Sequence, residues 1–306
     1  MKYFEKHPMP VIIVGIIGIS MSAILVRYST APSAVTAFWR LLWSVILLSP
    51  MALGSGRIRQ ELKTMDRKSA LLSVLSGLFL AAHFILWFEA LGMTSVASAA
   101  TLVCTEVIWV SLLFWLLWKG KIGFKAAATI GFTFLGSAVI ALADSGSGGA
   151  HLKGDILATL AAVASAVYML LGRSAQKKLS TTVYTYVVYS SCTLALLVLC
   201  AVQHHSLLGF GVRTVVVGAM LALFSTILGH SIFSWCLNYF SPSFVSACKL
   251  LEPVGAGIMA AVLFGEIPKP LALLGAAMIL LGVWYYARLE QNEQKNKPSQ
   301  AGTAKK

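Results

Sequence analysis

The chain has 306 residues, of which 58% are hydrophobic and only 11% charged, and its mean hydropathy is +0.81. Because a soluble globular domain carries about 25% charged residues, this composition excludes an ordinary soluble fold and indicates a membrane protein. The net charge of +13 does not indicate nucleic-acid binding, because the Lys and Arg residues lie in short runs between apolar segments.

Ten apolar segments follow in chain order, each near the roughly 20 residues that a membrane-spanning helix needs. They cover residues 10–28, 33–53, 68–91, 95–118, 122–143, 152–172, 181–203, 211–238, 243–264 and 270–288. The first apolar segment is too long for a signal peptide and lacks a small-residue cleavage site, so we expect a span. The polar stretch 291–306 has no apolar face and is predicted to be a disordered cytoplasmic tail.

The basic residues predict the orientation. With the N-terminus inside, the inner segments carry 18 Lys and Arg residues and the outer segments carry four, while Arg40 and Lys249 lie within spans. The positive-inside rule therefore predicts a multi-pass protein of the cell membrane with both termini in the cytoplasm. The five cysteines all fall in apolar segments without metal-ligand spacing, which favours reduced packing residues and no metal site.

The two halves of the sequence match each other when residues 1–143 are shifted by 146 positions without a gap. The matched pairs include Arg27 with Arg173, Glu106 with Glu252, and Gly136 with Gly282. Because each half holds five spans, the second half crosses the membrane in the opposite sense. We therefore predict an all-α integral membrane protein of ten transmembrane helices in two inverted repeats, residues 1–146 and 147–290, as is typical of secondary transporters. Shared hydrophobicity between unrelated apolar helices is the alternative explanation.

Ionisable side chains within the spans mark the candidate site, because such groups usually face a bundle interior or a wet cavity. A carboxylate at the bilayer centre costs roughly 2.5–3.5 kcal/mol, so two carboxylates at equivalent positions indicate a use. The groups are Arg40, His83, Glu89, Glu106, His230, Lys249 and Glu252. His83 maps within one residue of His230, although a buried His is often only a packing residue. Glu89 lies near the outer end of its span and is expected to be structural.

The surroundings of the two central carboxylates differ. Lys249 and Glu252 are three residues apart on one helical face and are predicted to pair, for structure or for function. Pro253 has no N–H, which would break the helix and free the Lys249 carbonyl for a proton, cation or polar group. Gly255 leaves room for close helix approach or for a ligand. Glu106 has no charged neighbour on its own helix, so it would either titrate in a proton-coupled carrier or stay protonated and bond a neighbouring helix.

Aromatic and basic residues extend the candidate site. His83 and Trp87 are four residues apart and share a face. Tyr168 and other aromatic residues would line a cavity, pack, or form an interfacial belt. Arg40 would either reach the outer surface or pair with a buried Glu. The sequence has no Walker motif, zinc-spaced His/Cys cluster or nucleophile elbow, so we expect no ATP drive, cofactor or enzymatic activity.

Two stretches, HFILWFEALGMTSVASAATLV and LGHSIFSWCLNYFSPSFVSACKLLEPVGAGIMAAVLFGEIP, resemble the EamA-type proteins of the drug/metabolite transporter superfamily. The resemblance runs from about residue 10 to 288, and Arg40 matches an Arg common in the family's second span. It implies a ten-helix bundle whose central cavity is formed mainly by spans 1, 3, 4, 6, 8 and 9. It also implies ATP-independent transport of metabolites or amino acids, often export. At position 106 the family more often has a neutral residue, and at position 249 an apolar one.

The sequence therefore predicts a secondary active exporter of small polar or amphipathic metabolites such as amino acids. It would work by alternating access, with Glu106 or Glu252 exchanging a proton against the substrate. Its expected partners are the substrate, the lipid bilayer and, if transport is coupled, protons; it would act as a monomer or a homodimer. The alternatives are a multidrug or organic-cation efflux carrier, and a membrane sensor or enzyme, for which two-fold pseudosymmetry has no evident use.

Overall fold

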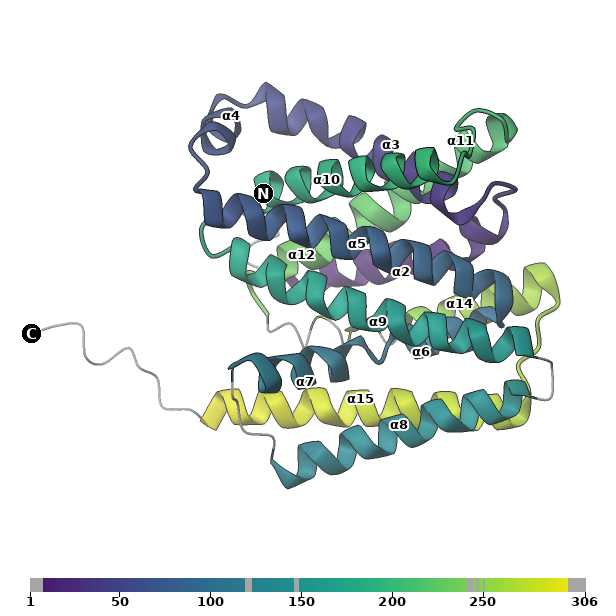
Figure 1. Ribbon diagram of the computed structural model, residues 1–306. Helices are drawn as coiled ribbons and strands as arrows, with labels where there is room; N and C mark the ends of the chain where they lie inside the picture. The colour runs from purple at the N-terminus through teal and green to yellow at the C-terminus, as the bar shows by residue number, and fades with distance from the viewer. Residues whose placement is uncertain are drawn as a thin grey trace, which may run out of the picture.

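The computed structural model describes residues 8–118, 123–145, 149–240, 245, 248–249 and 251–296, and all regular elements within them are helices (Figure 1). The helices are α2 (Pro8–Arg27), α3 (Ser33–Gly54), α4 (Gly56–Lys63), α5 (Arg67–Met93), α6 (Val96–Val103), α7 (Glu106–Trp118), α8 (Phe124–Ser145), α9 (Gly149–Ala175), α10 (Thr181–Val202), α11 (Gly211–Met220), η1 (Leu221–Ser231), α12 (Ile232–Cys236), α14 (Leu251–Phe264) and α15 (Pro270–Asn296).

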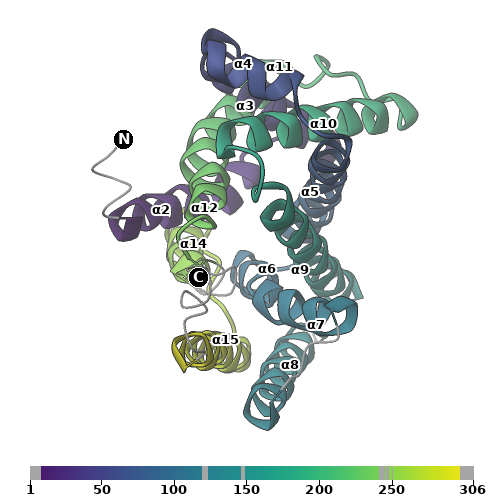
Figure 2. The ribbon, with the colours of Figure 1, turned by 90° about the vertical axis from the view of Figure 1, so that its left-hand side faces the viewer.

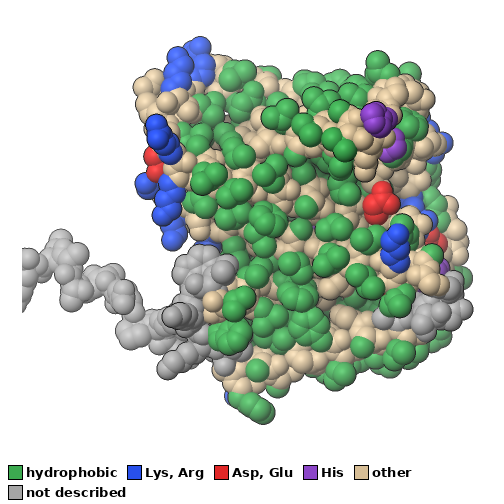
Figure 3. All heavy atoms as spheres, viewed as in Figure 1, with side chains coloured by type: hydrophobic (Ala, Val, Ile, Leu, Met, Phe, Trp, Pro, Cys, Tyr) green, Lys and Arg blue, Asp and Glu red, His purple; other side chains and the backbone are tan. Residues whose placement is uncertain are grey.

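The surface is that of a membrane protein. Within the described residues, seven helical stretches are long and apolar enough to cross a bilayer, and three shorter apolar helices accompany them: Phe124–Ile140, Leu251–Phe264 and Pro270–Tyr286. Large apolar side chains are exposed, such as Val262 at 78%. Figure 3 shows them over the middle of one face, while Lys and Arg gather at the edge where α4 and the start of α5 lie. A lipid environment accounts for such an exposed apolar surface.

Three predicted spans are not single α-helices. The span 95–118 divides into α6 and α7 at Cys104 and Thr105. The span 211–238 contains the π-helix η1 between α11 and α12. In the span 243–264, α14 begins only at Leu251; residues 241–244, 246–247 and 250 lie outside the described residues.

The prediction of a disordered tail is wrong for residues 291–296, because α15 continues through Asn296. The segment around its end, RLEQNEQKN, contains several good helix formers, so an existing helix extends into it at little cost. The remaining tail, residues 297–306, lies outside the described residues.

Helices from the two halves of the chain pack against each other. Helix α5 lies along α9, α2 along η1, α3 along α10 and α8 along α15. In Figure 2, α2, α12 and α14 lie on one side and α5, α6 and α9 on the other. This arrangement brings α2, α5, α6, α9, η1 and α14 around the centre of the molecule.

Close contact between α2 and η1 depends on Gly18. We expect Gly18→Ala to destabilise the protein by about 1–3 kcal/mol, because its new Cβ would collide with the Phe224 carbonyl oxygen. The control is Gly131→Ala in α8, where no atom lies within 4 Å of the added Cβ. That change should be neutral or stabilise by up to about 1 kcal/mol, since Ala favours a helix. Unfolding of the purified protein in detergent compares the two; equal losses would contradict the close contact.

Candidate functional site

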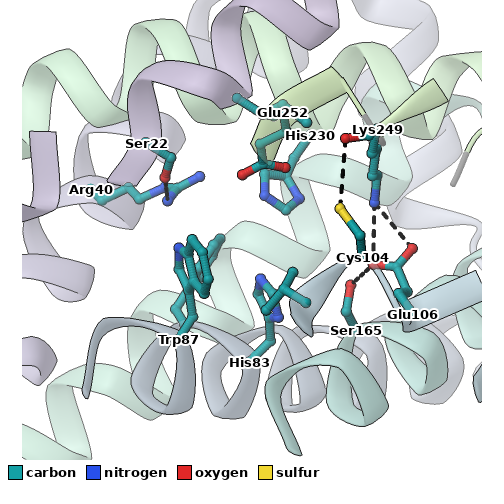
Figure 4. A pocket seen from close by; sticks show the side chains of 13 residues that line it. Ser22, Arg40, His83, Trp87, Cys104, Glu106, Ser165, His230, Lys249 and Glu252 are labelled. Carbon is teal, nitrogen blue, oxygen red and sulfur yellow. Dashed lines mark hydrogen bonds and ion pairs between the residues drawn. The ribbon is translucent and has the colours of Figure 1, made fainter. Parts of the chain in front are cut away.

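A pocket lies where α2, α3, α5, α9, η1 and the starts of α7 and α14 meet (Figure 4). Its lining residues are Ile19, Ser22, Arg40, His83, Phe84, Trp87, Val103, Cys104, Glu106, Ser165, His230, Lys249 and Glu252. All the ionisable residues that the sequence placed within spans therefore meet here, except Glu89. Trp87 is also present, and Tyr168 is not among the lining residues.

Glu106 is the first residue of α7 and is held from two sides. The Lys249 Nζ lies 3.2 and 3.3 Å from its two carboxylate oxygens, and the Ser165 hydroxyl donates a hydrogen bond to Oε2. The predicted pairing of Lys249 with Glu252 is therefore wrong. The prediction assumed that both residues lie on one helix, but Lys249 lies in a turn before α14. The three-residue spacing therefore does not place the two side chains on one helical face, and the Lys249 side chain contacts α7 instead.

Glu252 is the second residue of α14 and is 9% exposed, with its side chain at the pocket. Among the described residues, its carboxylate has no hydrogen bond and no ion pair, although Lys249, Glu106 and Arg40 are close enough to act on its charge. The structure thus reverses the expected division: Glu106 is the paired carboxylate, and Glu252 is the one without an ion pair in the described part of the chain.

Pro253 and Gly255 have structural places in α14. Pro253 falls in the first helical turn, where its missing N–H removes no hydrogen bond. The Lys249 carbonyl, which was predicted to be free, accepts hydrogen bonds from the Glu252 N–H at 2.8 Å and the Cys104 thiol at 3.7 Å. A Cβ on Gly255 would lie 3.0 Å from the Ser20 hydroxyl oxygen, so this glycine allows α14 to approach α2.

Arg40 is buried, with 1% of it exposed, which excludes the expected reach to the surface. Its Nε donates to the Thr226 hydroxyl at 2.8 Å and its Nη1 to the Ser22 hydroxyl at 3.1 Å. The guanidinium carbon lies 4.1 Å from the centroid of the Phe84 ring. Nη2 has no hydrogen-bond partner within the described part of the chain, and no carboxylate there forms an ion pair with Arg40.

The two histidines lie close together, as the 146-residue match predicts: their ring centroids are 6.2 Å apart. His83 Nδ1 is 2.9 Å from the Ala161 carbonyl oxygen. Because a carbonyl only accepts, Nδ1 carries a hydrogen, and in the neutral ring Nε2 remains an acceptor. The Tyr168 ring lies next to His230, with ring centroids 6.4 Å apart, and its hydroxyl is 3.0 Å from the Ser234 hydroxyl oxygen. Of the predicted roles for Tyr168, packing agrees with these contacts.

Comparison with known proteins decides the family. The EamA-like transporter family matches residues 9–142 and, separately, residues 152–288. The chain belongs to this family. It is thus a membrane transporter of the drug/metabolite transporter superfamily, as the sequence resemblance indicated, and the family points away from an enzyme.

This EamA-family chain is 26% identical over 262 residues to the uncharacterized transporter YxxF of Bacillus subtilis (strain 168), a match that covers 84% of the chain and 82% of YxxF. One solved crystal structure of a protein is similar in fold, with a TM-score of 0.63 at 16% identity. That similarity covers 95% of this chain and 99% of the other. The two chains therefore share a fold although only 16% of their aligned residues are identical.

Sequence reasoning missed the residues that hold the charged groups of this EamA transporter in place. Ser165 bonds Glu106, and Ser22 and Thr226 hold Arg40. Serine and threonine in apolar helices often bond their own backbone instead, as Ser44 does with the Arg40 carbonyl, so residue type alone does not identify them. Cys104, predicted to be a packing residue, lines the pocket.

Proposed function

We propose that this EamA-family transporter works by alternating access and exports small polar or amphipathic metabolites such as amino acids. The observation that carries the proposal is that eight of the 13 pocket-lining residues form four pairs related by the 146-residue offset. The pairs are Ile19 with Ser165, Phe84 with His230, Val103 with Lys249, and Glu106 with Glu252. A pocket on a pseudo-two-fold axis is where an alternating-access carrier binds its cargo.

Further observations support ten spans in two inverted repeats. Helix contacts recur when the helices are matched by the 146-residue offset. The contact of α5 with α9 matches the contact of η1 with α2. The contact of α6 and α7 with α9 matches the contact of α14 with α2. Both α7 and α14 begin beside a pocket Glu. The family matches each half separately. The basic residues at α4 and the start of α5 favour placing that end, and both termini, on the cytoplasmic side of the cell membrane.

Glu252 is the best candidate for coupling to protons. An unpaired carboxylate at the pocket can take up either a proton or a cationic group of the substrate, and the two compete for it. Competition of this kind couples the exit of the substrate to the entry of a proton. Glu106 is less suited, because Lys249 and Ser165 already occupy its oxygens.

The transport proposal is tested with purified protein in proteoliposomes without ATP. Amino acids and other small metabolites are first screened for a rise in the melting temperature of the protein, since ligands of the folded state stabilise it. We expect stabilising compounds to show counterflow, and vesicles without the protein are the control. The unpaired Glu252 also favours organic-cation efflux as a second candidate, so ethidium joins the screen. Absence of flux for every stabilising compound would contradict a transport function.

Near Arg27, contacts join three chain segments: the end of α2, the start of α6 and the residues after α14. Arg27 Nη2 lies 3.0 Å from Glu266 Oε1 and donates to the Thr94 carbonyl at 3.1 Å. The Val96 N–H donates to the other Glu266 oxygen at 3.0 Å. Arg173, the counterpart of Arg27, is exposed and has no ion pair among the described residues. The end of the molecule at Arg27 thus has an ion pair that the end at Arg173 lacks among the described residues. We therefore propose that the contacts of Arg27 and Glu266 form one gate of the carrier.

The gate predicts a change in access to the pocket. In a background with Cys104 as the remaining cysteine, Arg27→Glu should speed labelling of Cys104 by an impermeant thiol reagent from the Arg27 side. We expect an increase of up to roughly fivefold, since a partly exposed ion pair contributes at most about 1 kcal/mol. The double change Arg27→Glu with Glu266→Arg should restore only part of the slow labelling, because it restores the ion pair but not the hydrogen bonds to Thr94 and Val96. Equal rates in all three proteins would mean that the pair does not control access.

A further inference from the structure

A groove lies between α8 and α15, which run side by side at the edge of the molecule (Figures 1 and 2). Its volume is about 470 Å³, within the range of roughly 300–1,000 Å³ that small-molecule sites occupy. None of the described residues that line the central pocket belongs to α8 or α15. The groove is therefore separate from the candidate transport site.

The groove has a buried floor and exposed aromatic walls. Thr129 and Gly282 on the floor are buried. A Cβ on Gly282 would collide with the Thr133 hydroxyl, so the two helices touch at this level. On the walls, Phe124 is 88% exposed and Trp284 is 48% exposed. A hollow with large apolar side chains along its sides suits an apolar chain better than water.

The groove lies where the apolar stretches of both helices end. The stretch Phe124–Ile140 begins at the groove, and the stretch Pro270–Tyr286 ends there. Trp284 and Tyr285, which line it, are of the residue types that concentrate at the boundary between membrane and water. An occupant that follows the groove would therefore have an apolar part in the hydrocarbon layer and its other end among the lipid headgroups.

Two cations lie at the headgroup end of the groove. Lys125 is exposed and lines the groove. The guanidinium carbon of Arg288 lies 4.4 Å from the centroid of the Trp284 ring. Neither cation forms an ion pair with any carboxylate in the described part of the chain. The sequence places two more lysines just before α8, Lys119 and Lys121, without an acidic residue beside them. The charge at this end therefore complements an anion.

We propose that this groove binds an anionic phospholipid, with an acyl chain between α8 and α15 and the phosphate beside Lys125 and Arg288. Basic side chains at the cytoplasmic end of transmembrane helices attract anionic headgroups, and a phosphate accepts charge-assisted hydrogen bonds from both Lys and Arg. A zwitterionic lipid carries its own ammonium group, so these cations attract it less. The site is independent of the compound that the central pocket transports.

The test measures which lipid contacts Trp284. The purified full-length protein is placed in phosphatidylcholine vesicles that contain increasing fractions of phosphatidylglycerol with brominated acyl chains, which quench tryptophan fluorescence on contact. Brominated phosphatidylcholine is the comparison, and subtracting the emission of Trp284→Phe isolates Trp284. We expect brominated phosphatidylglycerol to bind about 10-fold more tightly or better, since each cation near the membrane surface contributes about fivefold toward an anionic headgroup.

Variants of the two cations give a second measurement. Lys125→Gln and Arg288→Gln should each lower the preference for phosphatidylglycerol about fivefold, and the double change should remove it. The matched control is Lys68→Gln, which changes an exposed lysine of α5 outside the groove and should leave the preference unchanged. All three side chains are exposed, so these changes leave the packing of the helices intact.

Three results would overturn the inference. Equal quenching by the two brominated lipids would show that the groove has no preference for an anionic headgroup. A preference that persists in the double variant would place the headgroup away from Lys125 and Arg288. Displacement of the brominated lipid by glycerol phosphate, which has the phosphate and no acyl chain, would assign the two cations to a soluble phosphate compound instead.

Discussion

Glu252→Gln is expected to abolish the acceleration of transport by a pH gradient. In proteoliposomes loaded with a transported compound, external acid should speed efflux by the unmodified protein, because protons replace the substrate on the Glu252 carboxylate. The amide of Gln neither takes up a proton nor pairs with a cationic group. We expect gradient-driven flux to fall at least about 10-fold, which corresponds to roughly 1.4 kcal/mol or more of lost interaction, and the uptake of protons that accompanies efflux to disappear with it. A pH-sensitive dye inside the vesicles measures that uptake.

Two matched variants separate this role from a general loss of charge. Glu89→Gln changes a carboxyl of α5 that is not among the pocket-lining residues, and it should transport normally. Glu106→Gln should weaken the folded protein, since Lys249 loses its ionic partner, but the remaining transport should keep its response to pH. Loss of that response in Glu106→Gln and its retention in Glu252→Gln would assign the coupling role to Glu106.

The sequence predicted where the site lies better than how its charges pair. Composition and segment length predicted an all-helical membrane protein, and the cost of intramembrane charge predicted Arg40, His83 and His230 as well as the two Glu residues. All of them meet at one pocket. These predictions depend on local chemistry and on the 146-residue match, both of which can be read from the chain alone.

The ion pairs depend instead on where two helices are interrupted. Lys249 and Glu252 would share a face only in a continuous helix, but α14 begins at Leu251. In the first half, α6 ends at Val103 and α7 begins at Glu106, with no Pro or Gly between them to predict the interruption. Packing with neighbouring helices sets these ends, so the partner of Lys249 could not be read from spacing.

The two interruptions also give the two matched Glu residues different surroundings. Glu106 and Glu252 occupy equivalent positions at the starts of α7 and α14. The residue before the first interruption is Val103, whereas the residue 146 positions later is Lys249, which donates to Glu106. A lysine at the matched position pairs the carboxylate in the first half of the chain, and within the described residues Glu252 has no ion pair, as its proposed coupling role requires.

Lys249→Met is expected to destabilise the protein by about 3–5 kcal/mol, because it leaves the buried Glu106 carboxylate without its cation while nearly keeping side-chain volume. The double change Lys249→Met with Glu106→Gln should recover most of this loss, since Gln retains a hydrogen-bonding oxygen for Ser165 and carries no charge. Lys249→Met with Glu252→Gln should recover little, because Glu106 still lacks the Lys249 cation. Unfolding free energies of the purified variants measure the coupling between each pair. Recovery with Glu252→Gln instead would place the ion pair within α14 and its preceding turn, and would return Glu106 to the role of the free carboxylate.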